Sequence, residues 1–168
     1  MQSDPRTSFF NEIGDMLPPF RLDGWRGCCI DPDQFGHPKM PHVLFEAVMA
    51  AVAPNQILLQ QYTPDKKQPI ALAPSWPAFE SSRNTDEHWS LEYVLFDASE
   101  TWAFLLDPDM LIFGAEVEVA GRVDIELTRL GTSLLQLTVN DYPEVPASSH
   151  MYPYIVQVLG ADPWQCAI

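Results

Sequence analysis

The chain has 168 residues and a mass of 19.0 kDa, enough for one domain whose core needs no metal or disulfide to fold. Nine lysines and arginines stand against 23 aspartates and glutamates, and this net charge of −14 argues against binding to nucleic acid or to an anionic membrane. Because no apolar run approaches the roughly 18 residues of a membrane span, the first residues lack a signal peptide's apolar stretch, and three cysteines suit a reducing compartment, we expect a cytoplasmic protein.

The first third of the chain predicts two helices joined by a long loop. Residues 4–17 have helically spaced apolar positions and end at a Pro-Pro pair, whereas residues 18–40 are rich in proline and glycine and indicate a loop. Residues 41–53 are bounded by prolines and contain a single charged side chain, Glu46. We therefore expect this second helix to be buried by other elements.

The middle of the chain predicts antiparallel strands joined by short turns. Residues 56–62 and 68–73 flank the polar segment TPDKK as a hairpin, and residues 73–84 form a loop or a short helix. Acidic turns at 97–100 and 107–109 separate the strands that follow. Those strands are expected at residues 89–96, 101–106 and 110–114.

Residues 116–127 admit two interpretations. Apolar and polar side chains alternate strictly, which favours a half-exposed strand. A helix that ends at Gly131 is the rival, because four apolar residues also have helical spacing: Ala120, Val123, Leu127 and Leu130. We favour the strand, and expect residues 134–140 to pair with it and residues 154–159 to form a last strand.

Helices that come before strands are typical of an α+β fold rather than of alternating βαβ units. We predict a single α+β domain over residues 1–168, in which the N-terminal helices pack on a mainly antiparallel sheet. The sheet is expected to be a meander of about five to seven strands.

Two adjacent cysteines, Cys28 and Cys29, raise the question of catalysis. They lie in the segment of residues 20–42, where His37 or His42 could activate a thiol. No redox or zinc spacing surrounds them, so small, semi-buried side chains are the alternative. A small cytosolic enzyme that uses this loop is therefore one hypothesis for the function.

Metal or cofactor binding finds little support in the sequence. No two of the four histidines have the paired spacing of a zinc site. The Asp-Pro-Asp segments at 31–33 and 107–109 lack the glycine and glutamate that continue a calcium loop, and both residue types are common in turns. We expect neither a metal nor another cofactor.

The distribution of charge indicates a binding surface. No lysine or arginine occurs from Asn84 to Gly121, whereas nine acids do. Such a surface complements a basic partner, and an aromatic side chain among the charges can anchor it. A solvated acidic face with core aromatics is the alternative. The residues expected to contact a partner are Asp86, Glu87, Glu92, Asp97, Glu100, Trp102, Asp107 and Asp109.

Residues 88–116 contain HWSLEYVLFDASETWAFLL and DPDMLIFGAE, a strand–turn–strand with a central tryptophan, then an acidic turn and a Phe-Gly pair. This texture resembles several bacterial immunity proteins, which neutralise toxins of polymorphic, contact-dependent or type VI systems. The resemblance implies a non-catalytic protein that covers the active site of a cognate toxin domain. Many such toxins are nucleases with basic clefts, which an acidic surface would complement.

Three hypotheses for the function follow. The first is an immunity protein whose partner is a protein, not nucleic acid or a membrane. The second is the enzyme based on the cysteine loop. The third is an adaptor subunit of a larger assembly, in which the aromatic residues meet a partner.

Overall fold

The computed structural model describes residues 24–31, 40–61, 69–85, 93–106 and 110–165. They form strands β1 (Trp25–Ile30), β2 (Ile57–Gln61), β3 (Ile70–Leu72), β4 (Tyr93–Phe96), β5 (Trp102–Leu106) and β6 (Leu111–Glu116). The helices among them are α2 (His42–Val52), α3 (Trp76–Thr85), α4 (Val117–Arg129), α5 (Leu134–Asp141) and α6 (Met151–Leu159). The predicted helix at residues 4–17 lies outside the described residues.

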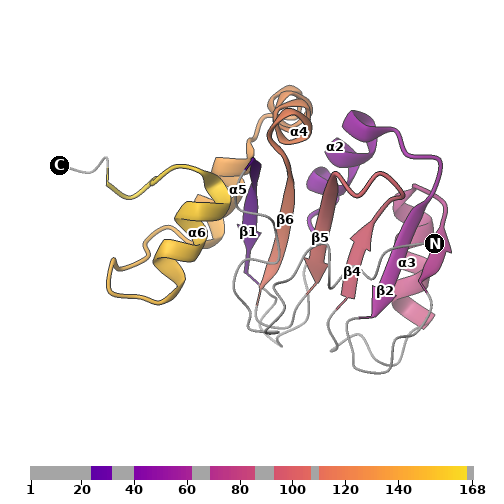
Figure 1. Ribbon diagram of the computed structural model, residues 1–168, viewed down its shortest axis with the longest axis horizontal. Helices are drawn as coiled ribbons and strands as arrows, with labels where there is room; N and C mark the ends of the chain where they lie inside the picture. The colour runs from indigo at the N-terminus through magenta and orange to yellow at the C-terminus, as the bar shows by residue number, and fades with distance from the viewer. Residues whose placement is uncertain (1–23, 32–39, 62–68, 86–92, 107–109, 166–168) are drawn as a thin grey trace.

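The six strands form one antiparallel sheet in the order β1-β6-β5-β4-β2-β3 (Figure 1). The pairing of β2 with β3 confirms the hairpin predicted for residues 56–62 and 68–73. Strands β4, β5 and β6 are neighbours both in sequence and in the sheet. A meander across the whole sheet is not confirmed, because β1 pairs with β6 and β2 pairs with β4.

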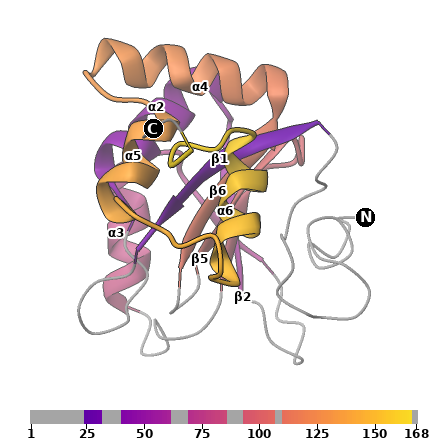
Figure 2. The same ribbon diagram turned by 90° about the vertical axis from the view of Figure 1, so that its left-hand side faces the viewer.

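Both faces of the sheet are covered by apolar side chains. On one face, Phe104 and Phe113 share a core with residues of α2 and α4. On the other face, Leu105 shares a second core with Ile155 and Val158 of α6. In Figure 2, α4 runs across the top of the molecule, and α6 lies beside β1. Strands buried on both faces are apolar throughout, which explains the runs YVLF and WAFLL.

Residues 25–30 form β1, so the prediction of a continuous loop over residues 18–40 is wrong. The segment WRGCCI has no alternation of apolar and polar residues, because it too is buried on both faces. Cys28 belongs to the core beneath α2 and α4, whereas Cys29 belongs to the core beneath α6. A segment of this composition is a strand only because its neighbours supply the burial.

Residues 117–129 form helix α4, so the strand favoured for 116–127 is wrong and the rival interpretation is confirmed. The helix buries Val119, Ala120, Val123 and Leu127 against the core. The strand pattern would have placed Ile125 on the buried side, but its side chain is 57% exposed. A helical period of 3.6 residues therefore buries more of this segment than a strand period of two.

The two strands predicted near the C-terminus are also helices. Residues 134–141 form α5, and Ser133 caps its N-terminus with a hydroxyl that accepts a hydrogen bond from the Gln136 N–H at 3.0 Å. Residues 151–159 form α6, which ends at Gly160 with a left-handed φ of 68°. A short apolar run is compatible with either a strand or a helix. In these two segments the capping residues Ser133 and Gly160 indicate a helix.

The α+β class is confirmed, but the helices are distributed differently from the prediction. Helix α2 confirms the helix expected at 41–53, and α3 confirms the short helix allowed at 73–84. Most of the described helices, α4 to α6, follow the sheet in the chain rather than precede it. Within the described ranges, every helix is too short or too polar to span a bilayer.

Candidate functional site

The turn between β4 and β5 is held by a buried carboxylate. Asp97 is only 7% exposed, and its Oδ1 accepts hydrogen bonds from the Ser99 N–H at 3.0 Å and the Ser99 hydroxyl at 2.5 Å. The Ser99 and Thr101 hydroxyl oxygens lie 2.9 Å apart. Glu100 closes the turn with a left-handed φ of 53°, and its N–H donates to the carbonyl oxygen of Asp97 at 3.1 Å. The chain thus fixes a carboxylate at the end of β4.

The sheet register brings two other segments to this turn. Leu58 pairs with Phe96, so the residues before β2 lie beside those after β4. These preceding residues include the end of α2, which stops at Ala53 in a left-handed conformation. On the other side, the Glu116 N–H donates to the carbonyl oxygen of Thr101 at 2.9 Å, which places the start of α4 next to the turn.

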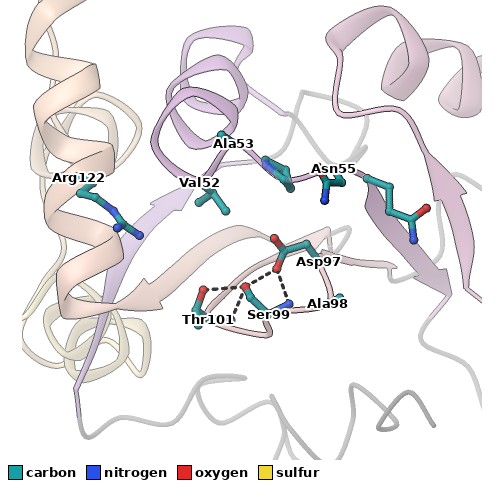
Figure 3. A pocket seen from close by; sticks show the side chains of 10 residues that line it. Val52, Ala53, Asn55, Asp97, Ala98, Ser99, Thr101 and Arg122 are labelled. Atoms are coloured by element: carbon teal, nitrogen blue, oxygen red, sulfur yellow. Dashed lines mark hydrogen bonds between the residues drawn. The ribbon is translucent and has the colours of Figure 1, made fainter.

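These three segments enclose a pocket of about 500 Å3 (Figure 3). Its wall consists of the end of α2 and the residues after it, the 97–101 turn, and Arg122 of α4. Figure 3 shows the Arg122 side chain reaching from α4 toward the end of α2. The pocket therefore combines a fixed carboxylate, two hydroxyl groups and one guanidinium group.

Arg122 makes no ion pair with a described residue, although its helix offers two candidates. Glu118 and Glu126 lie four residues before and after it, the spacing at which helical side chains pair. Glu126 instead pairs with Arg129 at 2.6 Å. The helical spacing of the apolar residues in 116–127 could have placed Arg122 on the exposed side of a helix. The strand interpretation of this segment concealed that position.

The same end of the sheet carries an acidic rim, which we define as Glu100, Glu116 and Glu118. Glu100 belongs to the turn, Glu116 ends β6, and Glu118 lies in the first turn of α4. Glu116 and Glu118 are exposed, and Glu100 is partly exposed. The rim lies beside the pocket, because the hydrogen bond from the Glu116 N–H to the carbonyl oxygen of Thr101 joins the start of α4 to the turn that lines the pocket.

The structure gives different outcomes for the predicted contact residues. Asp97 and Glu100 come together in the turn beside the pocket. Trp102 is fully buried in the core beneath α2 and α4, which corrects its assignment as an exposed anchor and supports the core alternative. Five predicted residues lie outside the described part of the chain: Asp86, Glu87, Glu92, Asp107 and Asp109.

The two adjacent cysteines are core residues of β1. Both side chains are 0% exposed, and both thiols are free. Burial raises the pKa of both thiols well above the ordinary range, so they stay protonated at neutral pH. Since a thiolate is the nucleophile, this environment gives no support to the enzyme hypothesis built on Cys28 or Cys29. His37 lies outside the described residues.

Native Cys28 and Cys29 are therefore expected to resist a thiol reagent. In a Cys166→Ser background, neither should react with Ellman's reagent at pH 8 until the protein unfolds, and both should react in denaturant. The rate at which the two thiols are labelled in denaturant should equal the rate at which the protein unfolds. Rapid labelling of the native protein would contradict the burial of these thiols and revive the cysteine enzyme.

His42 is engaged elsewhere. Its ring stacks on Trp76 with centroids 4.4 Å apart, and its Nε2 lies 3.2 Å from Glu46 Oε1. This contact joins α2 to α3. Among the described residues, no three histidine, cysteine, aspartate or glutamate side chains gather in a way that could hold a metal ion.

Comparison with known proteins finds no matching family model, no similar curated protein and no similar solved structure. The candidate site is therefore defined by its own geometry: the pocket between α2, the 97–101 turn and α4, with the acidic rim beside it.

Proposed function

We propose that this protein is a non-catalytic, cytoplasmic binding protein of the immunity type, which neutralises a basic toxin domain by covering its active site with an acidic surface. The observation that carries this proposal is the unbalanced charge of the chain, in which 23 aspartates and glutamates stand against nine lysines and arginines. The described side chains include twelve of these carboxylates and three guanidinium groups. The carboxylates are Asp31, Glu46, Glu80, Asp97, Glu100, Glu116, Glu118, Asp124, Glu126, Asp141, Glu144 and Asp162.

Two of these three arginines are already engaged within the chain. Arg129 pairs with Glu126, and Arg26 donates to the carbonyl oxygen of Trp25 at 2.6 Å. Because the chain has 14 more acidic than basic side chains, repulsion between like charges destabilises the free protein. A basic partner removes this repulsion, so charge complementarity favours association and speeds it.

The acidic rim is the part of this surface that we assign to the partner. It gathers three carboxylates from separate elements at one end of the sheet, next to a pocket. A protein that covers an active site needs a rigid surface that is ready before binding, because ordering a flexible one reduces affinity. The turn is fixed by the Asp97–Ser99 hydrogen bonds and by β4 and β5 on either side.

A triple variant, Glu100→Gln/Glu116→Gln/Glu118→Gln, is expected to weaken binding to the toxin at least tenfold, which corresponds to about 1.4 kcal/mol. The matched control is Glu46→Gln/Glu80→Gln/Glu144→Gln, which removes the same charge from exposed acids away from the rim. The candidate toxin is the product of the neighbouring reading frame. Growth protection in a bacterial host and calorimetric affinity are the measurements.

The dependence on salt provides a second readout. Affinity should fall between 50 and 500 mM salt, because the screening length shrinks from about 14 Å to about 4 Å. An adaptor subunit would bind its neighbour without protecting cells from a toxin, so the growth assay separates the two hypotheses. If the neighbouring product neither harms the host nor binds, or if both triple variants bind equally, the proposal is wrong.

A further inference from the structure

The pocket beside the rim contains a carboxylate with one oxygen still available. Asp97 is more than nine-tenths buried, yet only its Oδ1 is hydrogen-bonded, to Ser99. No described group donates to Oδ2, and Figure 3 shows this oxygen directed toward the end of α2. A buried carboxylate favours a charged donor, because such hydrogen bonds are about twice as strong as neutral ones.

The end of α2 adds to the negative potential of this pocket. The C-terminal end of a helix has partial negative charge on its free carbonyl groups. Helix α2 has no basic residue in its last turn to compensate it. Asn55 and Gln56 add side-chain amides to the wall, and Val52, Ala53 and Pro54 give it an apolar side. The pocket thus combines one carboxylate, the carbonyl end of a helix and an apolar surface.

We propose that this pocket binds the guanidinium group of an arginine on the partner protein, with Asp97 Oδ2 as the charged acceptor. The identity of the partner rests on the proposed function. The chemistry of the pocket does not depend on it. Guanidinium fits better than ammonium, because its five planar donors reach several acceptors at once and its faces pack on apolar surfaces.

Arg122 is the cation that such an arginine meets at the side of the pocket. In the free protein its guanidinium lines one side of the pocket and forms no hydrogen bond or ion pair with a described residue. Its side chain is exposed, and Glu118 lies one helical turn away at a spacing that allows an ion pair. When the partner's arginine enters, repulsion between the two guanidinium groups turns Arg122 away from the pocket and toward Glu118.

The test uses the intact protein and small guanidinium probes. Methylguanidinium chloride should bind with a dissociation constant in the millimolar range and shift the backbone amide signals of Gln56, Ser99 and Glu100 in a saturable way. The blocked amino acid N-acetyl-arginine-methylamide should produce the same shifts, because the pocket is open to a side chain on a backbone. Tetramethylammonium chloride, which has the same charge and no donor, should produce none.

Three variants separate the roles of the charges. Asp97→Asn keeps an oxygen for the Ser99 hydrogen bonds and should weaken methylguanidinium binding at least tenfold. Arg122→Gln removes the competing cation and should strengthen binding twofold or more. Glu144→Gln, in the loop between α5 and α6, lowers the net negative charge by the same amount as Asp97→Asn and should leave binding unchanged.

Each other outcome overturns the inference. Absence of saturable shifts in the wild-type protein excludes a guanidinium pocket, whatever the variants do. Weaker binding of methylguanidinium to Arg122→Gln would show that Arg122 does not compete with the probe, and would contradict the role given to it here. Binding of methylguanidinium but not of the blocked arginine would assign the pocket to a free small molecule. If Asp97→Asn does not fold, the wild-type and Arg122→Gln titrations still decide. Failure of toxin protection concerns the proposed function, and failure of these titrations concerns the pocket.

Discussion

Replacing Gly27 by alanine is expected to lower the free energy of unfolding by about 3–5 kcal/mol, at the upper end for single substitutions. Gly27 lies in β1 opposite Gly114 of β6. A Cβ atom at Gly27 would lie 1.7 Å from the carbonyl oxygen of Phe113 and 2.9 Å from the Cα of Gly114. These are backbone atoms, which cannot change rotamer to make room, so the two strands must move apart.

Chemical denaturation followed by circular dichroism measures this effect. Gly121→Ala is the matched control, because a Cβ at this exposed position of α4 meets no atom within 4 Å. That variant should gain about 0.5–1 kcal/mol, since alanine is the better residue in a helix. Similar stability of the two alanine variants would mean that β1 and β6 do not approach each other as described.

Thr138→Val is expected to lower the free energy of unfolding by about 2 kcal/mol, within the range for a buried donor left unpaired. Thr138 of α5 is fully buried, and its Oγ1 accepts a hydrogen bond from the Cys29 N–H at 3.0 Å. Valine has nearly the same shape but no acceptor. Because β1 is at an edge of the sheet that the described strands form, the Cys29 N–H then has no described strand to bond to on that side.

Thr138→Ser provides the control for shape. Serine keeps the hydroxyl group and loses one buried methyl group, which corresponds to about 1 kcal/mol. Valine should therefore be more destabilising than serine, although it fills the site better. The reverse order would indicate that burial of the methyl group, and not the hydrogen bond to the edge strand, is the main contribution of Thr138.

The sequence predicts those elements whose limits are marked by local chemistry. Helix α2 lies between Pro41 and Pro54, and the β4–β5 turn is marked by Asp97 and Ser99. Helix α5 also has such a mark, because Ser133 and Gln136 have the spacing of a capping box, but its short apolar run was interpreted as a strand.

Other elements depend on partners that are distant in the chain. Cys28 and Cys29 are strand residues because the sheet and the helices bury them from both sides. In the segment that forms α4, the apolar residues fit both strict alternation and helical spacing. Only the position of the core determines that Val123 is buried and Ile125 is exposed. No local pattern contains that information.

The candidate site was predicted only in part for the same reason. Asp97 and Glu100 stand out in the sequence as acids in a turn. Their relation to Arg122 depends on the packing of α2 against α4 and on the contact between Thr101 and Glu116. Trp102 belongs to the core because the first residue of β5 faces α2 and α4, which its acidic surroundings in the sequence do not reveal.

The pairing of β1 has a consequence for the order in which the molecule assembles. Trp25 pairs with Glu116 and Ile30 with Leu111, so β1 meets the one strand partner that it has among the described residues more than 80 residues later in the chain. Helices α5 and α6, which also contact β1, are synthesised after that. At about 5–20 residues per second, the ribosome completes β6 roughly 4–17 s after β1. The segment WRGCCI therefore stays unpaired until β6 has been synthesised. Non-local pairing of this kind slows folding.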